Sequence, residues 1–151
     1  MEHIWSPWRY RYVSKERSDE CIFCAKKSEY ILHRAEHNFV LLNLYPYTSG
    51  HLMIAPYQHV ATLAESGPAA LKEMMLLAQR AEIALKKVYN AAGFNMGLNI
   101  GEAAGAGVAG HIHMHVLPRW PGDANFMTTI AETRVLPEDL ETTYKRLLEV
   151  F

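Results

Sequence analysis

Three histidines alternate with three apolar residues between positions 111 and 116, and this alternation constrains the fold more than any other feature of the chain. Successive side chains of a β-strand point to opposite faces. His111, His113 and His115 are therefore expected on one face, about 6 to 7 Å apart along the strand, while the apolar residues between them point into the core. Packing alone rarely accounts for three imidazoles in a row, so the pattern predicts a strand that carries a chemical site.

A glycine-rich segment directly precedes the histidines and indicates what that site binds. Gly101, Gly105, Gly107 and Gly110 allow backbone amides to approach phosphate oxygens closely. A neutral imidazole is a good nucleophile toward phosphorus, because one ring nitrogen can keep its proton on a backbone carbonyl while the other attacks. Neighbouring imidazoles disfavour the charged form. The two features together predict chemistry at a phosphate, although spacing alone does not rank the three histidines.

The rest of the chain predicts strands around one long helix, and therefore an α+β fold in which helices pack on a sheet. Apolar runs at residues 39–42 and 52–55 predict two strands, and residues 95–100 and 111–116 predict two more. A helical pattern runs from Gly67 to about residue 90, and a second covers residues 137–151. The aromatic and basic residues 1–20 predict an N-terminal arm. At this length, residues 1–151 are expected to form a single domain.

Composition excludes several classes of partner. The net charge is −1, from 15 Lys and Arg against 16 Asp and Glu, so no overall positive field favours a nucleic-acid polymer. No apolar run approaches the roughly 20 residues that span a bilayer, and the N-terminus lacks a basic segment followed by an apolar one. We therefore expect a cytoplasmic protein that does not bind membranes.

The segment from His111 to Leu117 resembles the signature of the histidine triad (HIT) superfamily. Gly50-His51 and the segments around Asn43 and Asn99 are similar to other parts of that family's pattern, and residues 118–127 are similar to its bacterial branch that includes diadenosine tetraphosphate phosphorylases. The resemblance implies an antiparallel sheet of about five strands with one long helix and a C-terminal helix. It also implies a homodimer with a continuous sheet, in which the long helix and a central strand form the interface.

The resemblance also assigns roles to individual residues. His113 is the nucleophile that forms a covalent nucleotidyl-histidine, His115 and Asn99 contact the phosphate, and His51 supports the imidazole of His113. Asn43 holds the ribose hydroxyls, although Asn is also a common turn residue, and the amides of Gly105 and Gly107 are candidates for phosphate binding.

The implied function is cleavage of dinucleoside polyphosphates at the α-phosphate. The alternatives are a zinc-containing nucleoside phosphoramidase and a nucleotide-binding module without catalysis. In one respect the chain departs from many family members, since residues 106–110 offer no polar side chain to assist the leaving group. Base preference also stays open, because Phe39, Leu42 or the N-terminal aromatic residues provide only apolar contacts.

The two cysteines of the chain, Cys21 and Cys24, have the spacing that lets both thiolates bind one tetrahedral zinc ion. Such a pair needs two further ligands, and the resemblance to zinc-bearing relatives implies His59 and His111. A site with four protein ligands leaves no position for substrate, so the zinc is expected to be structural. Two alternatives remain, namely a pair of reduced thiols without metal and a redox-active dithiol.

Overall fold

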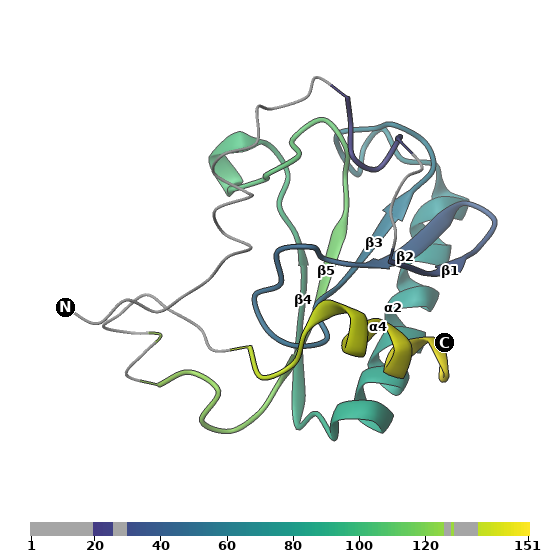
Figure 1. Cartoon of the computed structure of the whole chain (residues 1–151). Helices are drawn as coiled ribbons and strands as arrows, with labels where there is room; N and C mark the ends of the chain where they lie inside the picture. The colour runs from purple at the N-terminus through teal and green to yellow at the C-terminus, as the bar shows by residue number, and fades with distance from the viewer. Residues whose placement is uncertain (1–19, 26–29, 126–127, 129–135) are drawn as a thin grey trace.

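The computed structural model of the chain describes residues 20–25, 30–125, 128 and 136–151. All of the predicted N-terminal arm except Glu20 lies outside these residues. The described part contains one five-stranded antiparallel sheet with the strand order β1-β2-β3-β5-β4 (Figure 1). The strands are β1 (Ile31–Arg34), β2 (Asn38–Leu42), β3 (Leu52–Pro56), β4 (Gly93–Leu98) and β5 (Met114–Arg119). The predicted α+β class and the predicted sheet are confirmed.

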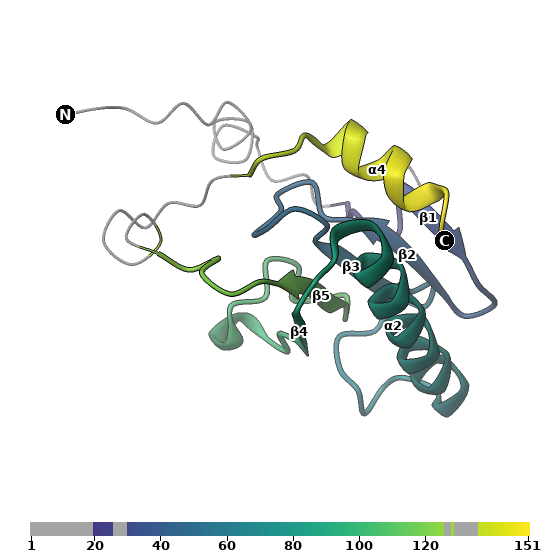
Figure 2. The same ribbon diagram turned by 90° about the horizontal axis from the view of Figure 1, so that it is seen from below.

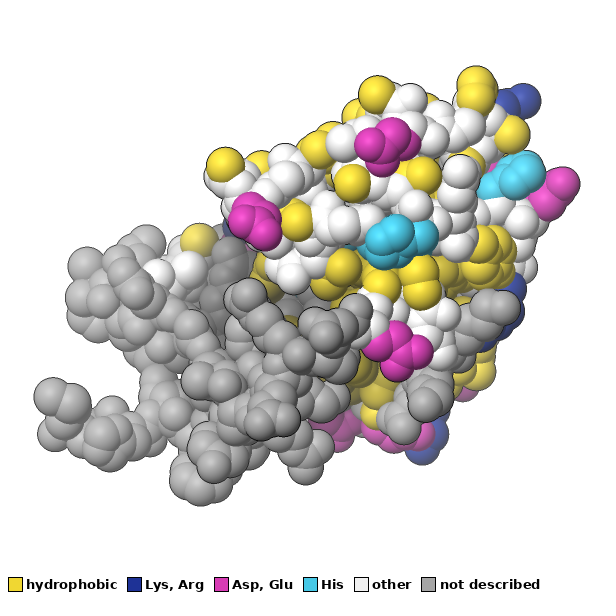
Figure 3. Space-filling model, turned by 90° about the horizontal axis from the view of Figure 1, so that it is seen from above, with side chains coloured by type: hydrophobic (Ala, Val, Ile, Leu, Met, Phe, Trp, Pro, Cys, Tyr) yellow, Lys and Arg dark blue, Asp and Glu magenta, His cyan; other side chains and the backbone are white. Residues whose placement is uncertain are grey.

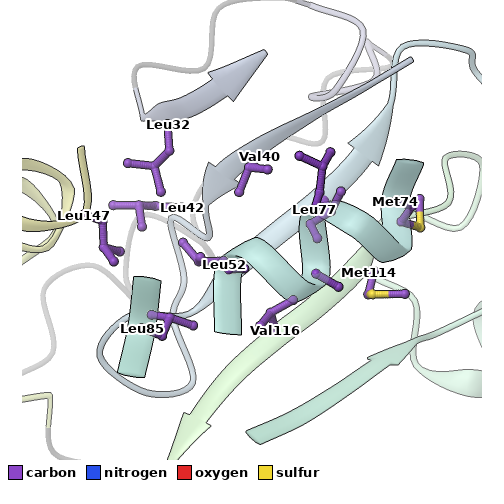
Figure 4. Close-up of a cluster of buried hydrophobic side chains, with 13 residues drawn as sticks. Leu32, Val40, Leu42, Leu52, Met74, Leu77, Leu85, Met114, Val116 and Leu147 are labelled. Atoms are coloured by element: carbon purple, nitrogen blue, oxygen red, sulfur yellow. The ribbon is translucent and has the colours of Figure 1, made fainter. Parts of the chain in front are cut away.

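Two helices, α2 (Pro68–Tyr89) and α4 (Leu140–Leu148), cover one face of the sheet (Figure 2). The main hydrophobic core lies between this face and the helices (Figure 4). Alternate residues of the strands supply one side of it, and α2 supplies the other with a stripe of small and large apolar side chains. The core includes Val40, Leu42, Leu52, Ile54, Met74, Leu77, Ala78, Ala81, Leu85, Met114, Val116 and Leu147.

Helix α2 begins and ends where its sequence predicts. Pro68 occupies the first turn after an extended Gly67, and Asn90 ends the helix in the left-handed conformation with a φ of 48°. Three large apolar side chains on this helix are nevertheless exposed, namely Met75, Leu76 and Ile83. No helix in the described ranges is both long and apolar enough to cross a membrane.

Gly50 sets how closely α2 approaches the sheet. Its φ is +76°, and a Cβ at this position would lie 2.9 Å from Leu85 Cδ2 and 3.2 Å from the ring of Tyr89. Both the conformation and the space therefore require glycine. The residue that follows Gly50 is His51, so the close approach of the helix lies next to the backbone of this histidine.

One strand, β1, was not predicted. Its four residues end in His33 and Arg34 and show no long apolar run. It forms because Leu32 reaches the main core and because its backbone pairs with β2 from Ile31 opposite Leu41. The strand depends on tertiary pairing rather than on its own pattern.

The histidine strand lies later in the chain than expected, at residues 114–119 rather than 111–116. Its pairing with β3 stops at Met114 opposite Ile54, and the N–H of Ile112 donates instead to the carbonyl of Val60 at 2.7 Å. His111 and His113 are therefore in an extended segment just before the strand. At the other end, β5 continues through Pro118 because beyond Val116 it pairs only with β4.

The boundaries of two further elements also need correction. Strand β4 covers residues 93–98 rather than 95–100, because Ala92 already donates to the carbonyl of Arg119 and the chain turns away after Leu98. Helix α4 covers residues 140–148 rather than 137–151. Asp139 caps it by accepting a hydrogen bond from the N–H of Thr142 at 2.7 Å.

Candidate active site and metal cluster

The three alternating histidines lie on the sheet face opposite α2. His115 is paired with Met53, whose side chain belongs to a second apolar cluster with Phe23, Phe39, Leu41 and Ala55. Ile112, Met114 and Val116 are buried, as the alternation predicts. All three imidazoles are buried too, so any substrate that reaches them does so at a desolvated site.

His113 has a ring orientation that leaves one nitrogen available for chemistry. Its Nδ1 lies 2.9 Å from the carbonyl oxygen of His111, and a carbonyl can only accept a hydrogen bond. Nδ1 therefore carries the proton, and no hydrogen bond from the part of the chain that the structure describes reaches the Nε2 lone pair. Burial lowers the pKa of His113, while the hydrogen bond to His111 opposes that shift. The ring is neutral near pH 7, as a nucleophile requires.

His51 and His115 form a hydrogen-bonded pair whose proton positions follow from the backbone. The N–H of Tyr47 donates to His51 Nδ1 at 3.1 Å, so the proton of a neutral His51 resides on Nε2. That Nε2 lies 2.9 Å from His115 Nδ1 and donates to it. The remaining proton of His115 is then on its Nε2. The hydrogen-bond partner of His51 is thus His115, whereas the resemblance implied support of His113.

Burial also keeps this pair uncharged. It lowers the pKa of His51 to about 3 and that of His115 to about 4, and repulsion between protonated rings adds to the shift, from His115 and His113 for His51 and from His113 for His115. The ring of His115 stands edge-on to that of His113, with 4.9 Å between the centroids. The three rings therefore form one neutral group, with an acceptor on His113 and a donor on His115.

Asn43 and Asn99 both lie at the edge of this group. The side-chain oxygen of Asn43 accepts from the N–H of Tyr45 at 3.0 Å, and its Nδ2 lies 3.3 Å from His51 Nδ1. Asn43 thus fills the turn role that its type suggests, next to the His51–His115 pair. Asn99 follows the last residue of β4, which pairs with Met114.

The glycine-rich segment turns back on itself after β4. It contains the short 3₁₀ helix η1 (Glu102–Ala104), and the N–H of Gly105 donates to the carbonyl of Glu102 at 2.9 Å. The Gly105 amide therefore stabilises the turn. Among the described residues, the N–H of Gly107 has no acceptor, and a Cβ at either glycine would meet no atom within 4 Å. Gly107 is the better placed of the two to approach a phosphate.

Cys21, Cys24, His59 and His111 come together in one cluster, as their spacing and the resemblance predicted. Their ligand atoms all lie within 4.8 Å of one another. His111 Nε2 lies 2.9 Å from the carbonyl oxygen of Pro56, so Nε2 carries the proton and the Nδ1 lone pair faces the cluster.

Four distances in the cluster are close to those around a tetrahedral zinc ion, and the most separated ligand atoms would have to move closer together to bind one. Zn–N bonds of about 2.0 to 2.1 Å and Zn–S bonds of about 2.3 Å place the nitrogens about 3.4 Å apart and each nitrogen about 3.6 Å from a sulfur. The two Nδ1 atoms are 3.3 Å apart, and the Nδ1 to Sγ distances are 3.2 to 3.5 Å. Two Nδ1 lone pairs this close repel each other unless a cation or a proton lies between them.

Two residues of the site were missed in the sequence. Phe23 packs its ring on both His111 and His113, with centroids 5.1 and 4.8 Å away. Its place between the two cysteines is the only signal that points to it. Tyr47 donates its N–H to His51, and its ring centroid lies 4.6 Å from that of His51. Leu42, one of the possible base contacts, faces the helices instead.

The described part of the face shown in Figure 3 is mostly uncharged. Figure 3 shows histidine side chains among hydrophobic and uncharged ones, with acidic side chains scattered between them and basic ones at the margin. The described residues that are visible there form no continuous Lys or Arg patch.

Comparisons with known proteins agree with this geometry. Residues 25–122 match the HIT domain family model. The chain is 35% identical to an AP-4-A phosphorylase of Mycobacterium tuberculosis, over 98% of this chain and 83% of that relative. A zinc-bound histidine triad family protein from Mycobacterium smegmatis superposes with a TM-score of 0.71 and 30% identity, covering 86% of this chain and 91% of the other. The chain belongs to the histidine triad family.

Proposed function

We propose that this protein cleaves dinucleoside polyphosphates of the diadenosine tetraphosphate type at the α-phosphate, through a covalent nucleotidyl-His113. The observation that carries the proposal is the neutral, buried His113, whose Nδ1 proton is held by the His111 carbonyl while Nε2 is unprotonated. The similarity to an AP-4-A phosphorylase supports the substrate class.

Nε2 of His113 attacks the α-phosphorus, and the bond from that phosphorus to the bridging oxygen of the polyphosphate breaks. His115 Nε2–H donates to a phosphate oxygen, because its Nδ1 already accepts from His51. Asn99 and the amide of Gly107 contact the same phosphate, and Asn43 binds the ribose. Inorganic phosphate or water then attacks the phosphorus of the nucleotidyl group and releases His113.

The group that assists the leaving polyphosphate is not a side chain of residues 106–110, because these are all glycine, alanine or valine. The candidate donors are then the backbone amides of this segment, Asn125 or Arg119, or a group of a partner subunit. We infer that they stabilise the departing oxygen without proton transfer. A good leaving group, such as a polyphosphate, suits this arrangement better than an amine does, since an amine requires a proton to leave.

The test is a product assay with purified protein. Diadenosine tetraphosphate is supplied with and without inorganic phosphate, and an adenosine phosphoramidate is supplied in parallel. ADP and ATP that form only with phosphate identify a phosphorylase, whereas AMP and ATP identify a hydrolase. Faster cleavage of the phosphoramidate would favour the phosphoramidase alternative. Binding of nucleotide without turnover of any of these substrates would refute the enzymatic function.

We further propose that Cys21, Cys24, His59 and His111 bind a structural zinc ion. A bound zinc ion would cross-link the Cys21–Cys24 loop to the segment that carries the histidines. Metal analysis of protein purified without chelators tests this directly, and one zinc per chain is expected. Protein with the four ligands intact and no zinc, even after incubation with zinc salts, would contradict it.

A homodimer is the last part of the proposal. The exposed apolar side chains Met75, Leu76 and Ile83 on α2, together with β4 as the edge strand of the sheet that the described residues form, provide a surface suited to a second copy. Sedimentation analysis of the wild type and of Ile83→Glu tests this surface. A dimer that Ile83→Glu converts to a monomer supports it, whereas a monomeric wild type contradicts it.

A further inference from the structure

Phe23 links the metal cluster to the proposed nucleophile. It lies between Cys21 and Cys24 and is only 5% exposed, whereas its neighbour Ile22 is 55% exposed. Its ring centroid is 4.8 Å from that of His113, with 38° between the planes, and 5.1 Å from that of His111. One side chain of the cysteine loop therefore contacts both a metal ligand and the nucleophile.

The contact matters because His113 has few other constraints. Among the described residues, only the His111 carbonyl accepts a hydrogen bond from this ring, and this bond from Nδ1 fixes the position of a single ring atom. The ring of His115 meets it at 76°. Phe23 supplies the apolar surface on which the His113 ring rests, so it limits the tilt that would move Nε2 away from the phosphorus.

The cysteine loop holds Phe23 in this place from both sides. The N–H groups of Cys24 and Ala25 both donate to the carbonyl of Cys21 at 3.0 Å, which forms a tight turn. The flanking thiols reach His59 and His111. On the other side, the Phe23 ring packs in the cluster with Phe39, Leu41, Met53 and Ala55. A bound metal ion would thus fix Cys21 and Cys24, and Phe23 lies between these two residues.

We propose that Phe23 is a positioning residue for His113 and that the metal cluster controls turnover through it. This inference rests on the proposed function of His113. A misplaced nucleophile slows the chemical step but leaves the substrate contacts in place, so the effect is expected in kcat rather than in KM.

The first experiment compares Phe23→Ala, Phe23→Leu and the matched control Ile22→Ala in the zinc-loaded protein. Phe23→Ala is expected to lower kcat about 10- to 100-fold with little change in KM, and Phe23→Leu is expected to recover part of the loss. Ile22→Ala is expected to retain the wild-type kcat. The number of nucleotide-binding sites per chain is measured in each variant and is expected to stay constant.

The second experiment observes His113 without any substrate. The ¹⁵N chemical shifts of its ring are expected to show protonated Nδ1 and unprotonated Nε2 in the wild type. In Phe23→Ala the two nitrogens are expected to give averaged shifts, because the ring leaves the His111 carbonyl. Removal of zinc from the wild type is expected to give the same averaging and a similar loss of kcat. In Phe23→Ala, zinc removal is expected to add little.

Each result bears on one proposal at a time. If Phe23→Ala has the kcat and the ring shifts of Ile22→Ala, the positioning role is wrong. It is also wrong if kcat falls only in proportion to the number of binding sites, because this indicates loss of folded protein. If the wild type cleaves no nucleotide, the proposed function fails, and the ring shifts still decide whether Phe23 orients His113.

Discussion

His111 and His113 stand two residues apart on the same face of one extended segment, yet they use opposite ring nitrogens. His111 donates from Nε2 to the Pro56 carbonyl and turns Nδ1 toward the cysteines. His113 donates from Nδ1 to the His111 carbonyl and keeps Nε2 unprotonated. The difference shows that the nearest backbone carbonyl, rather than residue type, decides whether an imidazole suits a metal or a phosphorus atom.

Removing each histidine in turn is the most direct test of the different roles of His111 and His113. His113→Ala is expected to lower kcat/KM by about 10⁴-fold or more while zinc content stays at the wild-type level, because the nucleophile is lost and the cluster is intact. His111→Ala is expected to lose zinc. Steady-state kinetics and metal analysis of both variants measure this. Loss of zinc in His113→Ala would reverse the two roles.

Removal of the metal tests the His111 side of the comparison. A chelator is expected to lower the melting temperature by about 10 °C, as a loss of about 3 kcal/mol does in a domain of this size. Calorimetry with and without chelator measures the change, and His113→Ala serves as the control because it should show an equal drop. A melting temperature that does not respond to complete zinc removal would contradict a structural role.

The stability of the protein at acid pH tests the His51–His115 pair next to His113. The folded pKa values of His51 and His115 are lowered to about 3 and about 4, from an unfolded value near 6.5. Their stabilisation is therefore complete above pH 6.5 and is lost as pH falls toward those values, because the unfolded state takes up protons first. Between pH 7 and pH 5 the free energy of unfolding is expected to fall by about 4 kcal/mol, about 2 kcal/mol from each histidine.

Denaturant unfolding at several pH values measures this loss. His51→Gln is the control, since it removes one of the two groups and should flatten the curve between pH 6.5 and 5. The partly buried carboxylates of Glu73 and Glu138 do not interfere in this range, because their pKa values are lowered from 4.5. An equally steep curve in His51→Gln would show that other groups cause the loss.

The smallest expected effect concerns the His51–His115 pair. His51→Leu removes the donor to His115 Nδ1 and is expected to lower kcat about tenfold, because His115 no longer keeps its proton on Nε2. His51→Gln retains a side-chain N–H and is expected to recover part of that loss. Equal rates in His51→Leu and the wild type would show that the tautomer of His115 does not matter for turnover.

Much of this site could be predicted from the sequence because its signals are local. The alternation of the histidines places Ile112, Met114 and Val116 in the core, and the Cys-x-x-Cys spacing identifies Cys21 and Cys24. The ring nitrogens that His111 and His115 use could not be predicted. They depend on Pro56 and Tyr47, which are distant in the sequence from His111 and His115, and no periodicity encodes such contacts.

The same distinction between local signals and distant contacts applies to the fold. Helix α2 was predicted almost to the residue, because its apolar period and its Pro68 and Asn90 ends are written in the sequence. Strand β1 and the start of β5 were not, since each is decided by a pairing partner. Ile112 leaves the sheet because its N–H finds Val60, which is 52 residues away along the chain.

Gly50 and Gly107 are expected to differ strongly in the substitutions that they tolerate. Gly50 is closed to every other residue, both by its φ of +76° and by the side chains of Leu85 and Tyr89 against it. Gly107 faces open space and has no such φ. In a library of all single substitutions, variants at position 50 should be absent among folded proteins, whereas position 107 should accept alanine and show its importance only in the selection for activity.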